Sequence, residues 1–120
     1  MHELSIAQSL INLASQTARE AGSSVVIKLN IRMGLLSGIG KNALLFSFGL
    51  AAEGTPCAGA ELAIEEVPVS VMCPHCEEVK FLVDQYCFQC PICGTPTPQI
   101  LSGQELELVS LEIAGEEVAA

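Results

Sequence analysis

The chain has 120 residues, half of them hydrophobic, and its 14 acidic and 5 basic residues give a formal net charge of −9 at pH 7. This length predicts one compact domain or a small domain with a smaller appendage, and the apolar content predicts a folded core rather than a disordered chain. Because the basic residues are few and scattered, the charge excludes a surface that neutralises nucleic-acid phosphates or an anionic membrane.

An amphipathic helix is predicted at residues 3–21. Its apolar residues recur at spacings of three and four, so they form one stripe along the helix. The stripe consists of Leu4, Ala7, Ile11, Ala14 and Ala18, with Leu10 beside it. A glycine and two serines at residues 22–24 end the helix.

A strand and a second helix are predicted next. Residues 25–32 alternate between apolar and polar, which is typical of a strand with one buried face. That face consists of Val25, Ile27, Leu29 and Ile31. After a glycine-rich loop, the second helix is expected from about Lys41 to Glu53. Its buried face is expected to consist of Leu44, Leu45, Phe48 and Ala51 or Ala52.

Two further strands, at residues 60–67 and 104–113, complete the predicted sheet. In the last strand the apolar residues change parity between Leu108 and Val109, which predicts a bulge or a strong twist near Leu108–Ser110. These elements predict an α+β fold with a small three-stranded sheet and two helices. The α+β domain comprises residues 1–69 with 103–120, and the cysteine-rich residues 70–102 form a lobe inserted between two of its strands.

The inserted lobe contains two Cys-x2-Cys motifs, Cys73 to Cys76 and Cys90 to Cys93, with thirteen residues between them. Two intervening residues let a tight turn direct both sulfurs at one ion, and Gly94 supplies the positive φ that closes the second turn. Four thiolates around Zn²⁺ form a closed, tetrahedral structural site. The spacing therefore predicts a zinc-ribbon-like lobe with two knuckles and one Zn(II) ion.

Three features of the lobe leave alternatives open. Cys87 lies three residues before Cys90, so these two could form the second pair, although the proline and glycine of the Cys90/Cys93 motif match the needs of a turn. His75 is either an exposed side chain or a pH-sensitive neighbour of the thiolates. The Cys73/Cys76 motif, Cys-Pro-His-Cys, also occurs in thiol–disulfide oxidoreductases, where it begins a helix; here the alternating segment that follows predicts a strand instead.

The remaining sequence features bear on the compartment. No apolar run approaches the roughly 18 residues that span a bilayer, and the first residues lack the basic and then apolar pattern of a signal peptide. We therefore expect a cytoplasmic protein without membrane insertion. Reducing conditions there favour a metal site over disulfides.

The first three residues, Met1, His2 and Glu3, form a second candidate metal site. The Met1 amine and the His2 amide nitrogen close a five-membered chelate ring, and the same amide with the His2 Nδ1 closes a six-membered ring. Glu3 can add its amide nitrogen or its carboxylate. Nitrogen-rich, near-planar sets of this kind suit Ni²⁺ and Cu²⁺. An ordinary helix start, with Glu3 favourably placed in the first turn, explains the same residues, so this pattern alone leaves both interpretations open.

Five stretches of the chain together resemble the HypA/HybF family of hydrogenase nickel-insertion proteins. In chain order they read MHELSIAQSL, IRMGLLSGI, EGTPCAGAELAIEEVP, CPHC…CPICG and SGQELELVSLEI. The resemblance implies that Met1, His2 and Glu3 bind Ni(II) transiently. It also implies that the two Cys-x2-Cys pairs hold a structural Zn(II) ion.

The resemblance further implies a nickel metallochaperone, not an enzyme, that delivers Ni(II) to the precursor of a [NiFe]-hydrogenase large subunit. A HypB-type nickel-binding GTPase is the implied partner, and both a homodimer and supply of nickel to urease are compatible with the sequence. The competing interpretation is a zinc-ribbon adaptor that binds other proteins and for which the amino-terminal residues are incidental. The α+β body is larger than such an adaptor needs.

Overall fold

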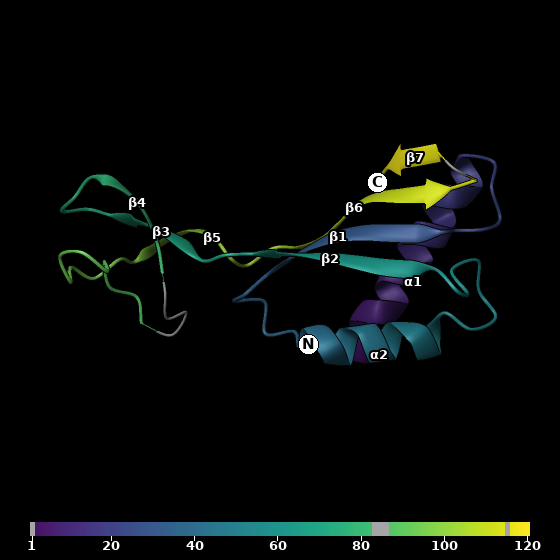
Figure 1. The fold of residues 1–120 in the computed structure, drawn as a ribbon, viewed down its shortest axis with the longest axis horizontal. Coiled ribbons are helices and arrows are strands. Elements are labelled where there is room, and N and C mark those ends of the chain that lie inside the picture. Colours follow the sequence, from purple (N-terminus) through teal and green to yellow (C-terminus); the bar gives the residue numbers. More distant parts are fainter. Residues whose placement is uncertain (1, 83–86, 115) are drawn as a thin grey trace. The chain divides into compact units, whose positions relative to one another are not determined.

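Two helices and seven strands make up the part of the chain that the computed structural model describes, which is residues 2–82, 87–114 and 116–120 (Figure 1). In chain order they are α1 (Glu3–Glu20), β1 (Lys28–Gly34), α2 (Lys41–Ala51), β2 (Glu61–Val67), β3 (Ser70–Cys73), β4 (Glu78–Phe81), β5 (Gln99–Ser102), β6 (Leu106–Ile113) and β7 (Glu116–Ala119). The predicted α+β class is confirmed. Neither helix in these ranges combines the length and the apolar character that crossing a membrane requires.

The chain divides into two compact units. The first comprises Met1–Arg32, Gly38–Glu65 and Glu107–Ala120, and the second comprises Met33–Ser37 and Glu66–Leu106. The second unit thus contains the whole predicted insertion, the short segments that flank it, and the residues around the end of β1. Whether the insertion is a domain that folds alone stays a prediction.

The sheet of the first unit has its strands in the order β2-β1-β6-β7. Strands β1 and β2 run parallel, because Glu61 N donates to Ile27 O at the start of the pair and Leu35 N donates to Val67 O at its end. Parallel neighbours need a crossover connection, and α2 is that connection. Helix α1 lies on one face of the sheet and runs across the strands (Figure 1).

Strand β7 is a fourth strand that the sequence pattern did not predict. It pairs antiparallel with β6, in a register that runs from Ser110↔Ala119 to Ile113↔Glu116. Two consecutive glutamates open it, and such residues are not typical of strands. The hairpin with β6 therefore decides its conformation rather than the local sequence.

Helix α1 buries one stripe of small and aliphatic side chains. The buried residues are Ile6, Ala7, Leu10, Ile11, Ala14, Ser15 and Ala18. The predicted stripe is correct except in the first turn, where Leu4 is 38% exposed and Ile6 is buried in its place. Since residues four apart lie one above the other on a helix, Ile6 continues the line of Leu10 and Ala14.

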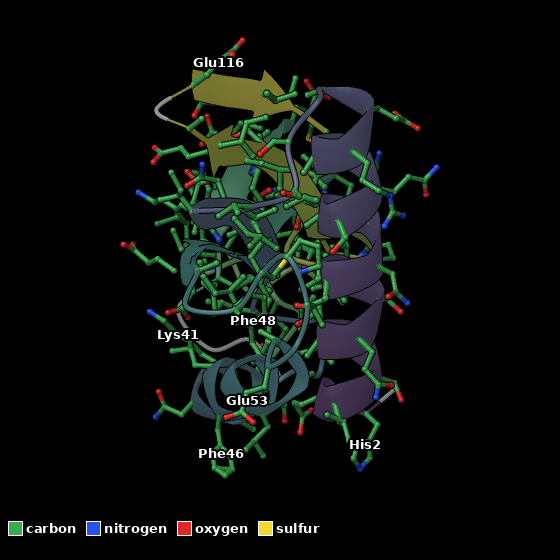
Figure 2. All side chains as sticks on the ribbon, turned by 90° about the vertical axis from the view of Figure 1, so that its right-hand side faces the viewer. His2, Lys41, Phe46, Phe48, Glu53 and Glu116 are labelled. Carbon is green, nitrogen blue, oxygen red and sulfur yellow. The ribbon has the colours of Figure 1, made fainter. Side chains whose placement is uncertain are left out.

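Helix α2 packs against α1 through a narrower stripe. Leu44 and Phe48 are buried as predicted, and Ala52, just after the helix, continues the same line at a spacing of four. The prediction that Leu45 is buried is wrong, because it lies about 100° around the helix from Leu44 and is 38% exposed. Phe46 is exposed on the outer side of the helix (Figure 2).

Strand β1 begins three residues later than predicted, at Lys28. Its buried residues are Leu29, Ile31, Met33 and Gly34. The predicted burial of Val25 and Ile27 is wrong, since both are exposed, and Val26 between them is buried instead. Val26 N donates to Pro56 O at 2.9 Å, so this segment follows the neighbouring loop and does not continue the alternation of the strand.

Strand β6 changes phase where the sequence pattern predicts a change. Arg32 Nη1 donates to Glu107 Oε1 at 3.2 Å, and Asn30 Nδ2 donates to Ser110 Oγ at 3.0 Å. Asn30 and Arg32 are two residues apart on β1 and so share a face of the sheet. Their partners on β6 are three residues apart, so the side-chain alternation is broken between them. A bulge at this place stays a prediction.

The second unit contains a three-stranded sheet in the order β4-β3-β5. Strand β3 pairs antiparallel with both neighbours, and its register with β4 runs from Ser70↔Phe81 to Cys73↔Glu78. Elsewhere in this unit, Gly34 meets the backbone of Gly103, where an added Cβ at Gly34 would lie 2.1 Å from the carbonyl carbon. Only glycine at position 34 permits this contact.

Candidate functional site

Four cysteines of the second unit converge on one point. The Sγ atoms of Cys73, Cys76, Cys90 and Cys93 all lie within 4.8 Å of one another, and all four are free thiols. Individual Sγ–Sγ distances are 3.6 Å between Cys73 and Cys93, 3.7 Å between Cys76 and Cys93, and 4.0 Å between Cys76 and Cys90. Zinc bound tetrahedrally at a Zn–S length of about 2.3 Å holds its sulfurs about 3.8 Å apart, so this donor set fits a zinc ion.

The first pair of sulfurs is positioned by the turn that joins β3 to β4. Cys73 is the last residue of β3 and is buried. Glu77 N donates to Cys73 O at 2.8 Å to close the turn, and Cys76 N lies 3.3 Å from Cys73 Sγ and donates to it. Glu77 has a φ of 56°, the left-handed value that Gly94 supplies in the second motif. A strand, β4, follows this motif rather than a helix, as the sequence pattern predicts.

The second pair is positioned by a similar turn. Gly94 N donates to Cys90 O at 2.9 Å, and Cys90 N donates to Thr95 O at the same distance. Gly94 has a φ of 76°, so the glycine stands where the sequence analysis placed a positive φ. A β-bridge between Gln89 and Pro96 closes the base of the loop.

The thiols of the cluster differ in how readily they ionise. The Thr95 hydroxyl, 3.2 Å from Cys93 Sγ, and the Thr95 backbone amide lower the pKa of Cys93 to about 6. The backbone amide of Cys93 lowers the pKa of Cys90. Hydrogen bonding to the sulfur of Cys93 and then of Cys73 raises the pKa of Cys76 to about 12. Thiolates this close do not all ionise together unless a metal ion offsets their charge.

Thr95 is a contributor that the sequence analysis missed. Its hydroxyl and its main chain support Cys93 and Cys90 respectively. Its place two residues after Cys93 was the available signal, because a hydroxyl so near in sequence is close enough to reach the sulfur.

The other cysteines and the histidines of the described chain lie outside the cluster. Cys87 is exposed, and its Sγ lies 3.9 Å from Gln89 Oε1. His75 is exposed at the tip of the first turn. Cys57, in the first unit, is buried, with its Sγ 3.9 Å from Ser15 Oγ. Of the two candidate second pairs, the geometry therefore brings Cys90 and Cys93 to the other two sulfurs.

The amino-terminal candidate residues lie at the start of α1. His2 is exposed and is the N-cap of the helix, with extended backbone angles, and its carbonyl accepts a hydrogen bond from Ile6 N at 3.0 Å. Its imidazole makes no capping hydrogen bond and points away from the body of the unit (Figure 2). Glu3 is the first helical residue and is half-buried. Met1 lies outside the described residues.

This position leaves the main-chain nitrogens of the helix start available to a metal ion. The first N–H groups of an α-helix have no carbonyl partner within the helix. A metal ion that replaces the amide proton of His2 or Glu3 therefore breaks no hydrogen bond of the α1 ladder. The hydrogen bonds of α1 therefore do not compete with the main-chain ligation of a metal ion that the sequence analysis expects at these residues.

Comparison with known proteins gives a consistent result. The family model described as "Hydrogenase/urease nickel incorporation, metallochaperone, hypA" matches residues 1–113. A "Hydrogenase maturation factor HypA" of Chloroflexus aggregans is 54% identical over 112 residues, which cover 93% of this chain and 98% of the relative. The protein of the same description from Deinococcus radiodurans is 45% identical over 108 residues, covering 90% and 89%.

Solved structures agree with this match. The solution structure of the Ni metallochaperone HypA from Helicobacter pylori is similar with a TM-score of 0.66 and 26% identity, over 97% of this chain and 100% of that one. A second solution structure, of a HypA protein, is similar with a TM-score of 0.68 and 26% identity, over 97% and 98%.

Proposed function

Because this chain belongs to the HypA family of hydrogenase/urease nickel-incorporation metallochaperones, we propose that it binds Ni(II) at its amino terminus and delivers it to the precursor of a [NiFe]-hydrogenase large subunit. The ligands are the Met1 amine, the His2 amide and Nδ1, and Glu3. The observation that carries the proposal is the exposed His2 at the N-cap of α1, with its imidazole free of any capping bond.

The chemistry of delivery follows from this position. Nickel enters as the Met1 amine and the His2 amide lose their protons, and two fused chelate rings then hold it on one side. One side of the ion stays open to an incoming ligand because the three residues are consecutive and lie at the end of a helix. A ligand of the recipient protein can therefore coordinate nickel before the ligands of the chaperone dissociate. Protonation of the amine and the amide then completes the release.

We further propose that the four cysteines of the second unit bind one Zn(II) ion. Their sulfur spacing and the two turns with positive φ support this assignment. When bound, zinc supplies a structural cross-link and no catalytic water, because four protein ligands fill a tetrahedral site. The cross-link joins the β3–β4 turn to the loop that precedes β5.

The partners and setting of the proposal follow the family. We expect a HypB-type nickel-binding GTPase to supply or exchange nickel, and the hydrogenase precursor to receive it, in the cytoplasm. The protein binds and transfers an ion without bond-making chemistry on a substrate, so we propose no enzymatic activity. We propose residues 70–102 as the zinc-binding domain and residues 1–69 with 103–120 as the nickel-binding domain.

A nickel titration of two variants tests the proposal. In the untagged, zinc-loaded protein, His2→Ala should abolish stoichiometric Ni(II) binding in calorimetry while zinc content and helix content stay unchanged. The matched control is His75→Ala, which changes the other histidine and should bind nickel as the wild type does. Nickel binding that survives His2→Ala, or that disappears with His75→Ala, would show that the site lies elsewhere.

A further inference from the structure

Lys80, in the middle of β4, is a charged residue with little access to water. Its side chain is 15% exposed, whereas the side chains of Lys28 and Arg32 in the first unit are 31% and 41% exposed. Covering an ammonium group is unfavourable unless negative charge lies close to it. The surroundings of Lys80 must therefore supply that charge.

The strand register identifies what those surroundings are. Lys80 pairs with Val71 of β3, and Glu78 pairs with Cys73. Cross-strand partners project to the same face of a sheet, and so do residues two apart on one strand. Lys80, Glu78 and Cys73 therefore share one face, which is the face where Cys73 joins the other three sulfurs.

Two kinds of negative charge act on Lys80 there. The Glu78 carboxylate accepts a hydrogen bond from its Nζ. This carboxylate is the main cause of a raised Lys80 pKa, and the thiolates of Cys76 and Cys90 add to the effect. The ammonium group is thus held in place by Glu78 and lies within electrostatic reach of the sulfur cluster.

We infer that Lys80 is the counter-cation of the four-cysteine zinc site and strengthens its hold on zinc. The inference rests on the zinc assignment made above. Four thiolates and one Zn²⁺ carry a net charge of −2, whereas the empty site is less negative, because Cys76 keeps its proton there. A fixed positive charge nearby stabilises the loaded site more than the empty one. It also draws electron density from the sulfurs, which makes them less reactive towards electrophiles.

Zinc competition against a chromogenic chelator tests this role. At low ionic strength Lys80→Gln should weaken zinc binding about tenfold, the lower end of the effect for groups that support a metal ligand set. Lys80→Arg keeps the charge and should stay close to wild type. The matched control is Lys28→Gln, which removes a half-buried lysine of the other unit and should have no effect.

The outcomes separate this inference from the zinc assignment. A wild-type protein without one firmly bound zinc would overturn both. Wild-type zinc binding in Lys80→Gln would overturn only the role of Lys80. Equal losses in Lys80→Gln and Lys80→Arg would show that Lys80 acts by packing and would also overturn its role as a counter-cation.

Discussion

The cysteine cluster of the second unit and the start of α1 in the first unit arrange their candidate metal ligands in opposite ways. The four sulfurs come from two turns separated in sequence, and Cys73 and Cys90 are buried. At the helix start the candidate ligands are consecutive, and His2 is exposed. The cysteine cluster exists only in the folded second unit, because its ligands are distant in sequence. The candidate ligands at the helix start are already adjacent in the sequence, so they do not depend on the rest of the fold. A site of the first kind suits a permanent ion, and one of the second kind suits an ion in transit.

The largest effect is expected from removing a cluster ligand. Cys90→Ser should lose zinc, because a three-thiolate remnant forfeits a large part of the about 10–16 kcal/mol with which such sites bind zinc. The second unit should lose amide protection with it, while α1 and nickel binding persist. Metal analysis and hydrogen exchange of the dialysed protein measure the three properties.

The control for this change is Cys87→Ser, which removes an exposed thiol outside the cluster. It should keep one zinc per chain. Loss of nickel binding in Cys90→Ser would contradict the independence of the two sites, since the amino-terminal site would then depend on the zinc lobe.

Acidification should affect nickel binding strongly. Binding displaces one proton from the Met1 amine, whose ordinary pKa is about 7.7–8.0, and one from the His2 amide. Below pH 7 each displaced proton costs a factor of ten per pH unit, so the nickel association constant should fall about 100-fold or more between pH 7 and pH 6. Titrations at three pH values measure the slope. A slope near zero would mean that neither nitrogen is a ligand.

A smaller effect on stability at high pH is expected from Cys57, a buried cysteine that lies outside the metal cluster. Burial raises the pKa of Cys57 above its ordinary value of 9.0. The unfolded thiol therefore ionises first as pH rises, so stability is unaffected well below pH 9 and declines above it, by at most about 1.4 kcal/mol per pH unit. Cys57→Ala lacks this decline.

Urea unfolding followed by helix circular dichroism at pH 8, 9 and 10 checks this prediction. The stability difference between the wild type and Cys57→Ala should be constant up to about pH 9 and should then shrink. A difference that stays constant to pH 10 would show that the Cys57 thiol is reached by solvent or that its environment stabilises the thiolate.

The sequence predicts features that depend on local spacing and misses those that depend on strand register. The Cys-x2-Cys turns and Gly94 are predictable because their geometry is set within a few residues. Glu77 takes the same left-handed conformation without a glycine to signal it. The position of Lys80 beside the cluster follows only from the pairing of β3 with β4, and the exposure of Val25 follows only from the loop beside it.

The amino terminus shows a different limit. Met1, His2 and Glu3 are adjacent, so their chelate rings can be drawn from the sequence. The same residues also make an ordinary helix start, and no periodicity separates the two interpretations. The family resemblance is what favours the nickel interpretation, and the comparisons confirm the resemblance itself along almost the whole chain.

The most direct test of the nickel site is a Ni(II) titration of zinc-loaded protein that carries one additional glycine before Met1. The extension moves the free amine out of the five-membered ring with the His2 amide and leaves every side chain in place. Stoichiometric nickel binding should be lost, or weakened at least about 100-fold, while zinc content and fold stay as in the untagged protein. Wild-type nickel affinity in the extended protein would contradict the proposed nickel site.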